Sequence, residues 1–587
     1  MPGGLLNIIA FGNANIILNG NPTKTFFKTT YAKHTNFGMQ KFRLDYNGSR
    51  DIDPNNDSVY TFKVPRHAEL LMDTYFVFTV PNIWSTILPP GFIGDIWKAY
   101  QFKWIENLGT SCIKNIRIII GTQVIQEYDG EYIRCMVERD YSEEKKKQFD
   151  YMTGNVDQLH HPERHVRNSI AERYPNTVYS GETLEGPEPS IRGRKIYVPL
   201  CPWFMNHSKL ALPLVCLQYS EVTIEVTMRP IREMFTINNV SESTEKDVIN
   251  YDANNGTEDE PEYIYENIIS DYYQRIQPNF SYDRHNLYRF LQPPPSITLT
   301  DGEYADKTNN WNADVHIIAN YGFLTPEESK VFALNEQKYL IKDIKRSIFY
   351  NIVGTKKVKI ESNALVSNWM WFYRRNDAYK RNEWSNYTNW KTSSFPFQLE
   401  SGNEVGYNIS TGTGTDADQG NSIGPAFDLE LDGTTTISTN HYVTPLFSLQ
   451  HEKFILNSFS ILIDGKIREN EFDSGVYQYV EKYQSTKSSQ DFGIYHYHLC
   501  LDSANYLQPT GAINLSRFKN IEFEMTTLIP EQDASAVSLT LCDENGGVIG
   551  VTKEEPIYIY MYDMYLFEER YNILRFISGN AGLLFAR

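Results

Sequence analysis

A few short patterns in the sequence could carry chemistry, but each lacks a part that its chemistry needs. Gly420–Gly424 has the Gly-x-Ser-x-Gly spacing of a nucleophile elbow, which requires a strand before the serine and a helix after it. Here the match lies in a stretch rich in Gly, Ser and Thr, and Pro425 follows it directly. No phosphate-binding loop, zinc-protease helix or dinucleotide-binding glycine pattern occurs elsewhere. We therefore expect no catalytic residue and no enzyme activity.

Two patterns resemble metal sites incompletely. Asp51–Asp57 places oxygen atoms at four positions of a calcium loop, but it lacks the glycine at the sixth position and has Phe62 where a glutamate is needed. His160, His161 and His165 could supply imidazoles, although adjacent histidines in a loop rarely converge on one ion. Both patterns are typical of polar surface loops. We expect neither a metal ion nor a cofactor.

A cluster of tryptophans admits two interpretations. Trp369 and Trp371 share one face of a predicted strand and are expected to pack in the core or between domains. Trp384 and Trp390 lie in a polar stretch, where exposed indole rings could stack on sugars. Packing within their loop or against a neighbouring subunit is the favoured explanation. A carbohydrate-binding or carbohydrate-active protein therefore remains the alternative.

The composition of the chain restricts the kinds of partner and the location that we expect. The 587 residues include 73 acidic and 55 basic ones, a net charge of −18, and such a surface repels phosphate backbones, so we expect no direct contact with nucleic acid. No run of eighteen apolar residues predicts a transmembrane helix, and the amino terminus lacks the basic region of a signal peptide. Six cysteines without a Cys-x-x-Cys pair indicate reduced thiols in a cytoplasmic protein.

Nine Asn-x-Ser/Thr sequons occur in the chain. A protein without a signal peptide does not meet the ordinary secretory machinery. The candidate N-glycosylation positions, if the chain is modified, are those on the long loops: Asn239, Asn255, Asn386 and Asn408.

Alternating hydrophobicity predicts an all-β protein. In Val222–Met228 and Ile521–Thr526 every second residue is apolar, as in strands that cover a core with one face. The best candidate for a long helix is Ile93–Leu108. Further strands are predicted at Leu70–Val80, Ile116–Ile125, Val315–Leu324, Val358–Ile360, Trp369–Tyr373, Phe459–Ile463 and Ile557–Leu566.

A weak internal repeat organises these strands. Four elements recur in the same order in both halves: Ile118–Tyr132 with Ile461–Tyr477, Ile196–Cys201 with Ile494–Cys500, the strand at Val222 with that at Ile521, and Tyr321–Glu328 with Asp563–Glu569. Ordered recurrence indicates a duplication. It predicts two consecutive β-domains of about eight mostly antiparallel strands each, with the boundary near Thr325–Gln337.

Three segments resemble one protein family. Asn21–Tyr31 with Thr35–Phe37, Tyr197–Leu200 with Ala211–Val222, and Tyr571–Leu583 are similar to the start, an internal block and the end of the major capsid proteins of nucleocytoplasmic large DNA viruses. The resemblance implies two consecutive eight-stranded antiparallel jelly rolls with long loop insertions, as in the larger, mimivirus-like members. It divides the chain into an arm at 1–28, a first jelly roll at 29–325 with insertions near 141–195 and 231–313, and a second at 326–587 with a long loop near 376–428.

The resemblance also implies a structural role. Chains of this family form trimers whose six jelly rolls make a pseudo-hexagonal capsomer, and capsomers tile the icosahedral shell. The implied partners are other copies of the chain and minor capsid proteins beneath the shell, with room for an internal viral membrane under it. Asn21, Phe26, Phe27 and Lys28 are the implied contacts of an arm along the inner face. The implied location is the virion capsid, assembled in the cytoplasm of the infected cell.

Overall fold

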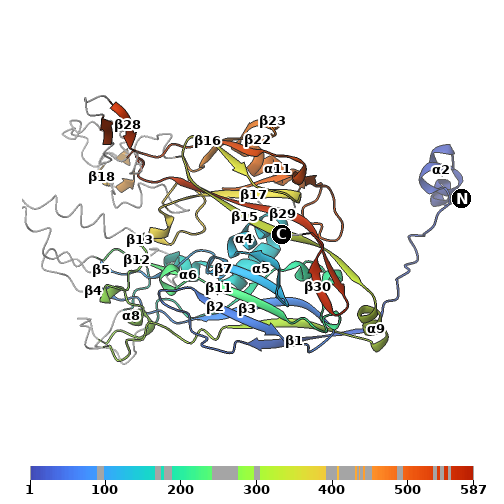
Figure 1. The fold of residues 1–587 in the computed structure, drawn as a ribbon, viewed down its shortest axis with the longest axis horizontal. Coiled ribbons are helices and arrows are strands. Elements are labelled where there is room, and N and C mark those ends of the chain that lie inside the picture. The colour runs from blue at the N-terminus through green and yellow to red at the C-terminus, as the bar shows by residue number, and fades with distance from the viewer. Residues whose placement is uncertain are drawn as a thin grey trace, which may run out of the picture.

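Two β-sandwiches lie side by side in the computed structural model, one from each half of the chain (Figure 1). The structure describes residues 2–88, 98–164, 174–177, 188–240, 275–295, 304–391, 452–485, 493–532 and 557–585, and strand backbones at 406–408, 430–431, 435–436, 440–442, 539–542 and 548–552.

The first sandwich consists of two antiparallel sheets. One contains, in spatial order, β1 (Phe37–Asp45), β14 (His316–Leu324), β3 (Leu70–Val80) and β9 (Arg194–Pro199), with the short β10 (Leu212–Pro213) also on β3. The other contains β2 (Ser58–Val64), β11 (Val222–Met228), β7 (Ile113–Ile120) and β8 (Gln123–Tyr128).

The second sandwich repeats this arrangement strand for strand. One sheet contains β15 (Gln337–Ile352), β29 (Tyr562–Ile577), β17 (Leu365–Arg375) and β24 (Ile494–His498), with β25 (Ile513–Asn514) on β17 and β30 (Asn580–Leu583) on β29. The other contains β16 (Thr355–Ile360), β26 (Ile521–Thr527), β22 (Leu456–Ile463) and β23 (Lys466–Asp473).

Both sandwiches have the connectivity of a jelly roll. In each, the first, eighth, third and sixth long strands form one sheet, and the second, seventh, fourth and fifth form the other. The all-β double jelly roll expected from the sequence is therefore confirmed. The four recurring sequence elements also occupy equivalent strands, since β7, β9, β11 and β14 correspond to β22, β24, β26 and β29.

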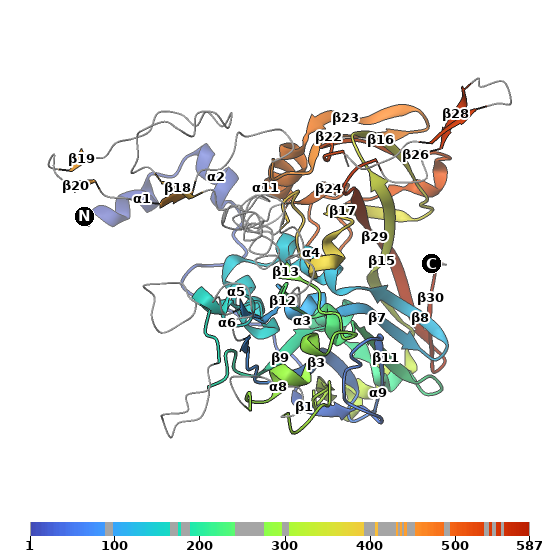
Figure 2. The ribbon, with the colours of Figure 1, turned by 90° about the vertical axis from the view of Figure 1, so that its left-hand side faces the viewer.

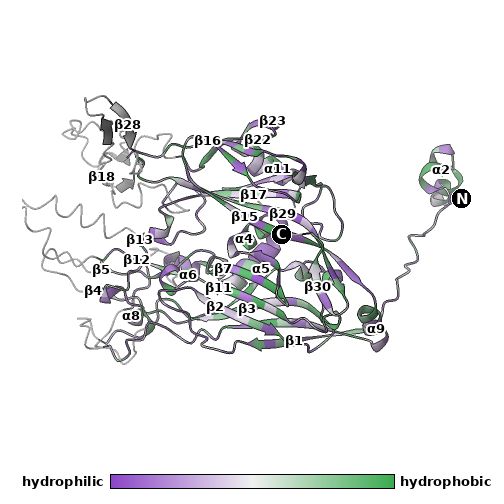
Figure 3. Ribbon diagram, in the orientation of Figure 1, coloured by the Kyte–Doolittle hydropathy of each residue, from purple (hydrophilic) through white to green (hydrophobic). Residues whose placement is uncertain are grey.

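Period-two hydrophobicity builds the two cores. In β11 the side chains of Val222, Ile224, Val226 and Met228 are buried, whereas the three residues between them are half-buried. β26 shows the same pattern, and Figure 3 shows apolar and polar residues interspersed along the strands of both sandwiches. Trp371 stacks on Phe459 with ring centroids 4.5 Å apart, and Trp369 meets Phe523 edge-on at 5.2 Å. The core role predicted for these two tryptophans is confirmed.

The helices differ from the prediction. Over the described part of Ile93–Leu108 the chain forms β5 (Lys98–Ala99) and β6 (Lys103–Trp104), and α3 (Leu108–Ser111) only begins at its end. The helix prediction is wrong because Tyr100, Phe102 and Trp104 alternate into the core with the period of a strand. Residues 93–97 lie outside the described residues.

Two predicted strands differ in their bounds from the strands in the structure. The strand predicted at Ile116–Ile125 is two strands, because Gly121 turns the chain between β7 and β8 with a φ of +64°. The strand predicted at Ile557–Leu566 begins later, at Tyr562, and continues to Ile577 as β29.

Two substantial helices of the first half were not predicted. α4 (Gly130–Asp140) begins after Asp129, whose carboxylate accepts a hydrogen bond from the Tyr132 amide at 2.7 Å, and α5 (Glu143–Thr153) follows it. Figure 1 shows α4 between the two sandwiches. α9 (Pro326–Leu334) joins β14 to β15.

Shorter elements complete the described chain. They are α1 (Leu6–Ile9), α2 (Asn13–Asn19), β4 (Ile87–Leu88), α6 (Asp157–His160), β12 (Phe235–Asn238), β13 (Arg275–Ile276), α8 (Tyr288–Leu291), β18 (Gly406–Asn408), β19 (Glu430–Leu431), β20 (Thr435–Thr436), β21 (Asn440–Tyr442), α11 (Glu481–Ser485), β27 (Leu539–Cys542) and β28 (Val548–Thr552).

Replacement of Ile224 tests the inward register of β11. Ile224→Asp buries an unpaired carboxylate between β2 and β7, and we expect a loss of about 4 kcal/mol or more in the free energy of unfolding, with little soluble protein. Thr223→Asp is the matched control, because it faces the other way, opposite Lys63, and should change stability by less than about 0.5 kcal/mol. Urea denaturation of both variants measures the difference, and equal effects would show that the register is wrong.

Candidate functional site: the junction of the two jelly rolls and the uncovered edge of the second

A buried ion pair joins the two jelly rolls. Arg139 of α4 and Glu569 of β29 approach to 2.9 Å, and neither side chain is exposed to solvent. Glu569 also accepts hydrogen bonds from the Tyr132 hydroxyl at 2.9 Å and the Asn368 amide at 2.8 Å, and Lys342 lies 3.3 Å away. The carboxylate therefore has partners from α4, β15 and β17 at once.

The surroundings of Glu569 determine its charge. Burial alone would raise the pKa of this carboxyl group. The positive charges of Arg139 and Lys342, with the hydrogen bonds from Arg139 and Asn368, outweigh burial and hold the pKa well below its usual range. Glu569 is thus ionised in the folded protein at every physiological pH.

Further ion pairs attach the start of α4 to the second jelly roll. Glu131 contacts Arg374 of β17 at 2.5 Å, and Arg374 donates a hydrogen bond to the Tyr565 hydroxyl at 2.6 Å. Asp129, the residue that caps α4, contacts Arg346 of β15 at 2.5 Å. α4 therefore belongs to the first jelly roll by sequence but is held by charged groups of the second.

Trp384 packs between the halves of the chain. Its indole Nε1 donates to the Glu233 carbonyl at 2.9 Å, and the Arg229 guanidinium lies 4.0 Å from its ring centroid. Trp390 is half-buried, with Lys453 at 5.2 Å from its ring. The exposed aromatic platform that a sugar-binding function would need at these two rings is absent.

The second jelly roll covers one edge of the first. β8, the edge strand of its sheet, lies against β15 and β30 (Figure 2). The Gln126 amide donates to the Lys342 carbonyl at 2.6 Å, and nearby the Ser220 hydroxyl donates to Asn580 at 2.9 Å. A sheet edge that would otherwise expose polar backbone groups and apolar side chains is thereby closed.

The equivalent edge of the second jelly roll has no such cover from the described residues. β23 corresponds to β8, and within the described residues it pairs with β22 alone. Apolar side chains are exposed on β23, on the π-helical turn Val476–Val480 and on α11, and we call them the β23 edge surface: Ile467, Phe472, Tyr479, Val480 and Tyr483. Ile467 is 66% exposed and Tyr483 90%. An apolar surface of this kind on a sheet edge is typical of a protein–protein contact.

The amino-terminal arm extends away from the body (Figures 1 and 2). Residues 2–36 form only short helices, and almost every side chain is exposed, including the large apolar ones of α1 and α2. Phe26 and Phe27 are fully exposed, Asn21 adopts a φ of +49°, and Lys28 is exposed. The structure thus places all four predicted arm residues outside the jelly rolls, where they are available to another molecule.

The incomplete metal patterns are ordinary polar contacts. The Asp53 carboxylate accepts from the amides of Asn55 and Asn56 at 2.7 Å each, as in a turn. His161 lies 3.5 Å from Glu106 and 3.3 Å from Glu163. His165 and Gly420–Gly424 lie outside the described residues. Among the described residues, no group of three His, Cys, Asp or Glu side chains could hold a metal ion, and no helix is long and apolar enough to cross a membrane.

The candidate glycosylation positions differ in their surroundings. Asn386 is 5% exposed, its Nδ2 donates to the Trp390 carbonyl at 2.9 Å, and its Oδ1 accepts from Thr388, so the folded protein leaves no room for a glycan there. Asn239 is half-buried. Asn255 and the side chain of Asn408 lie outside the described residues.

Solved structures share this fold. The PBCV-1 virus capsid chain is 18% identical, with a TM-score of 0.55 over 96% of this chain and 100% of that one. The Faustovirus major capsid protein is 11% identical, with a TM-score of 0.52 over 97% of this chain and 96% of that one. The class defined by the fold is therefore the double jelly roll.

Family models and relatives identify the family. The model of the major capsid protein N-terminus matches residues 25–266, and that of the large eukaryotic DNA virus major capsid protein matches residues 328–582. This chain belongs to the major capsid proteins of large eukaryotic DNA viruses, which confirms the resemblance seen in the sequence.

Curated relatives agree with the family models. The major capsid protein of Phaeocystis pouchetii virus is 30% identical over 40% of this chain, a match that spans only 42% of that protein's length. The major capsid protein of Paramecium bursaria Chlorella virus 1 is 22% identical over 100% of both chains. Probable capsid protein 4 of Acanthamoeba polyphaga mimivirus is 22% identical over 89% of this chain and 93% of that protein.

Neutralising Glu569 tests the junction. Glu569→Gln keeps the shape of the side chain but leaves Arg139 and Lys342 without their shared carboxylate, and we expect a loss of about 3–5 kcal/mol in the free energy of unfolding at pH 7. Because the folded pKa is depressed, this contribution is present above the ordinary pKa of 4.5 and is lost as the pH falls. When the pH is lowered from 6 to below 4.5, the free energy of unfolding of the wild type should therefore fall more than that of the variant.

A surface pair supplies the control for this measurement. Glu336 contacts Arg575 at 2.6 Å, but both side chains are about one-third exposed. Glu336→Gln should leave the urea midpoint nearly unchanged because solvent screens the pair. If Glu569→Gln behaved like Glu336→Gln, the buried pair would not be what holds the two jelly rolls together.

Proposed function

We propose that this protein is the main structural subunit of the icosahedral shell of a large DNA virus, and that it acts without catalysis. Three chains would form a capsomer in which six jelly rolls alternate around a threefold axis. The observation that carries this proposal is the unequal cover of two equivalent edges, since among the described residues β8 is closed by the second jelly roll and β23 is left open. Membership of the capsid family supports the same conclusion.

The contact between β8 and β15 suggests how the chains would join. In the first jelly roll the strand equivalent to β15 is β1, which is the outer strand of its own sheet. β1 exposes Phe37 and Met39, and α9, which takes the place of β30 after β14, exposes Val331 and Leu334. The β23 edge surface of one chain would thus bind β1 and α9 of the next. Repeating this head-to-tail contact closes a ring after three chains.

Introducing charges into the proposed apolar contacts tests the trimer. We expect the wild type to have a native mass of three times the 68.0 kDa of one chain and to show six lobes in electron-microscope class averages. Ile467→Glu with Tyr483→Glu should give folded monomers, and Phe37→Glu with Leu334→Glu on the opposite surface should do the same, because each places charges in an apolar contact.

A substitution outside both surfaces is the control for the trimer. Tyr282 is 57% exposed on the first jelly roll, and Tyr282→Glu should leave the trimer intact. A wild type that remains monomeric, or edge variants that remain trimeric, would contradict the proposed contact.

The arm is proposed to join capsomers rather than chains within one capsomer. Asn21, Phe26, Phe27 and Lys28 would order on the inner face of the shell, against neighbouring capsomers and the minor capsid proteins beneath them. The protein would then be located in the virion, after assembly in the cytoplasm of the infected cell. Direct contact with the genome is not part of this proposal, since the chain carries a net charge of −18.

Removal of the arm tests this division of roles. Deletion of residues 2–28 should leave the trimer and its melting temperature unchanged, because the arm is exposed along its length, but should prevent trimers from forming ordered arrays. Phe26→Ser with Phe27→Ser should weaken array formation in the same direction. Light scattering and electron microscopy of trimers at increasing concentration give the readout, and loss of the trimer itself would refute the assignment.

A further inference from the structure

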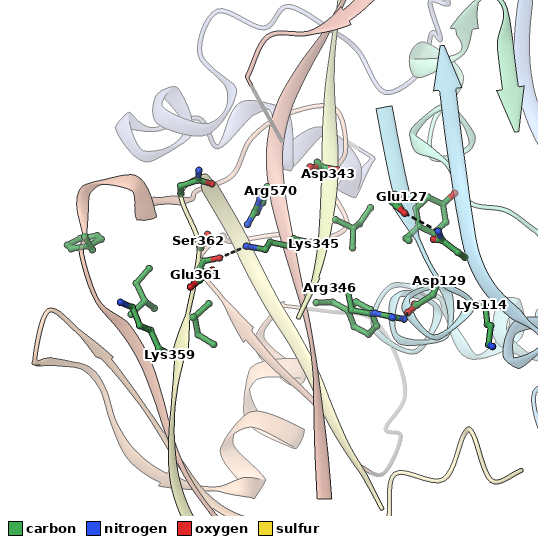
Figure 4. Close-up of a pocket in the computed structure, with 18 of the residues that line it drawn as sticks. Lys114, Glu127, Asp129, Asp343, Lys345, Arg346, Lys359, Glu361, Ser362 and Arg570 are labelled. Atoms are coloured by element: carbon green, nitrogen blue, oxygen red, sulfur yellow. Dashed lines mark hydrogen bonds and ion pairs between the residues drawn. The ribbon is translucent and has the colours of Figure 1, made fainter. Parts of the chain in front are cut away.

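A cleft of about 930 Å³ lies between the two jelly rolls (Figure 4). Its lining comes from β7, β8 and the start of α4 in the first jelly roll, and from β15, β16 and β29 in the second. The cleft exists only because the junction holds the two halves together. None of the contacts proposed for assembly uses its lining residues.

The lining is basic although the chain as a whole is acidic. Six cationic residues line the cleft: Lys114, Lys345, Arg346, Lys359, Lys519 and Arg570. Four carboxylates also line it: Glu127, Asp129, Asp343 and Glu361. An excess of positive charge in a concave site on a chain of net charge −18 indicates a site for anions.

Ion pairs with protein carboxylates occupy only some of these cations. Lys114 contacts Asp57 at 2.7 Å and Arg346 contacts Asp129 at 2.5 Å. Within the described part of the chain, no carboxylate forms an ion pair with Lys345, Lys359 or Lys519. Lys345 donates to the backbone carbonyl of Glu361, as Figure 4 shows, so its charge is not neutralised there.

Arg570 supplies a buried donor that lacks an acceptor. Its side chain is 7% exposed, and its Nε donates to Glu568 at 2.5 Å. Glu568 also accepts from the Ser362 hydroxyl at 2.7 Å and the Trp369 indole at 3.0 Å, so both its oxygens are engaged. The Arg570 Nη2 has no hydrogen-bond partner among the described residues. A buried N–H group without an acceptor is costly, and an oxyanion in the cleft would satisfy it.

We propose that this cleft binds a small anion that carries two or more phosphate groups. Arg570 and Lys345 would hold one phosphate, and Lys359 and Lys519 would contact the others. The volume far exceeds that of a single phosphate ion, and the unneutralised cations come from several strands, which favours an extended polyanion. Asp343 and Glu361 oppose the anion, so removing the charge of Glu361 strengthens binding. All four of these cations belong to the second jelly roll, so the bound anion neutralises that side of the cleft, independently of capsomer assembly.

Isothermal titration calorimetry of the purified full chain with tripolyphosphate at low salt tests this proposal. We expect saturable binding to the wild type, at least tenfold weaker binding to Arg570→Gln and Lys345→Gln, and several-fold tighter binding to Glu361→Gln. Lys338→Gln is the control, because Lys338 lies on the same strand as Lys345 but is 60% exposed outside the cleft, and its affinity should equal that of the wild type. Inorganic phosphate should bind more weakly than tripolyphosphate.

Three results would overturn the proposal. The first is that the wild type shows no saturable binding of tripolyphosphate. The second is an equal loss of affinity in Lys338→Gln and Lys345→Gln, which would indicate attraction to any surface lysine. The third is an unchanged affinity in both Lys345→Gln and Glu361→Gln. These last two substitutions replace side chains at the cleft surface, so they keep the test decisive if Arg570→Gln fails to fold. A fourth result, equal affinity for phosphate and tripolyphosphate, would refute the multiply phosphorylated ligand.

Discussion

The ion pair between Arg139 and Glu569 is the contact on which the relative position of the two jelly rolls depends. Both charges are removed from water, so each is tolerated only while the other, with Lys342 and Asn368, remains in place. A rotation of one jelly roll against the other would leave a buried charge unpaired. Hydrophobic burial alone would join the two sandwiches less specifically, so the network selects one arrangement of them. The covered β8 edge follows from that arrangement.

The sequence predicted the elements that obey a local rule and missed those that depend on distant ones. Val222–Met228 and Leu70–Val80 were predicted at their exact bounds because the first alternates buried and half-buried residues and the second is a continuous run of mostly apolar residues. α4 was missed because its burial comes from two jelly rolls, including charged residues such as Glu131 and Arg139 that are polar in any sequence pattern. The junction had no sequence signal, since its partners Tyr132 and Glu569 are 437 residues apart.

Because the fold is duplicated, the chain contains two equivalent sheet edges, β8 and β23. The two jelly rolls have equivalent strands, yet within the part of the chain that the structure describes β8 is covered and β23 is not. The internal contact thus serves as a template for the contact proposed between chains. Trp384, whose ring looked available for a ligand in the sequence, instead fills the space between the halves beside Arg229. Aromatic residues in a polar stretch consequently gave no reliable sign of a binding surface here.

The separation of 437 residues between Tyr132 and Glu569 also has a consequence for synthesis. At about 5–20 residues per second, a ribosome needs roughly 20–90 s to add the residues that lie between α4 and its cover. For much of that interval all strands of the first jelly roll have been synthesised, but β8 is still uncovered and Arg139 still lacks its carboxylate partner. The nascent chain is then most prone to pair with other chains, and the speed of translation sets how long this exposure lasts.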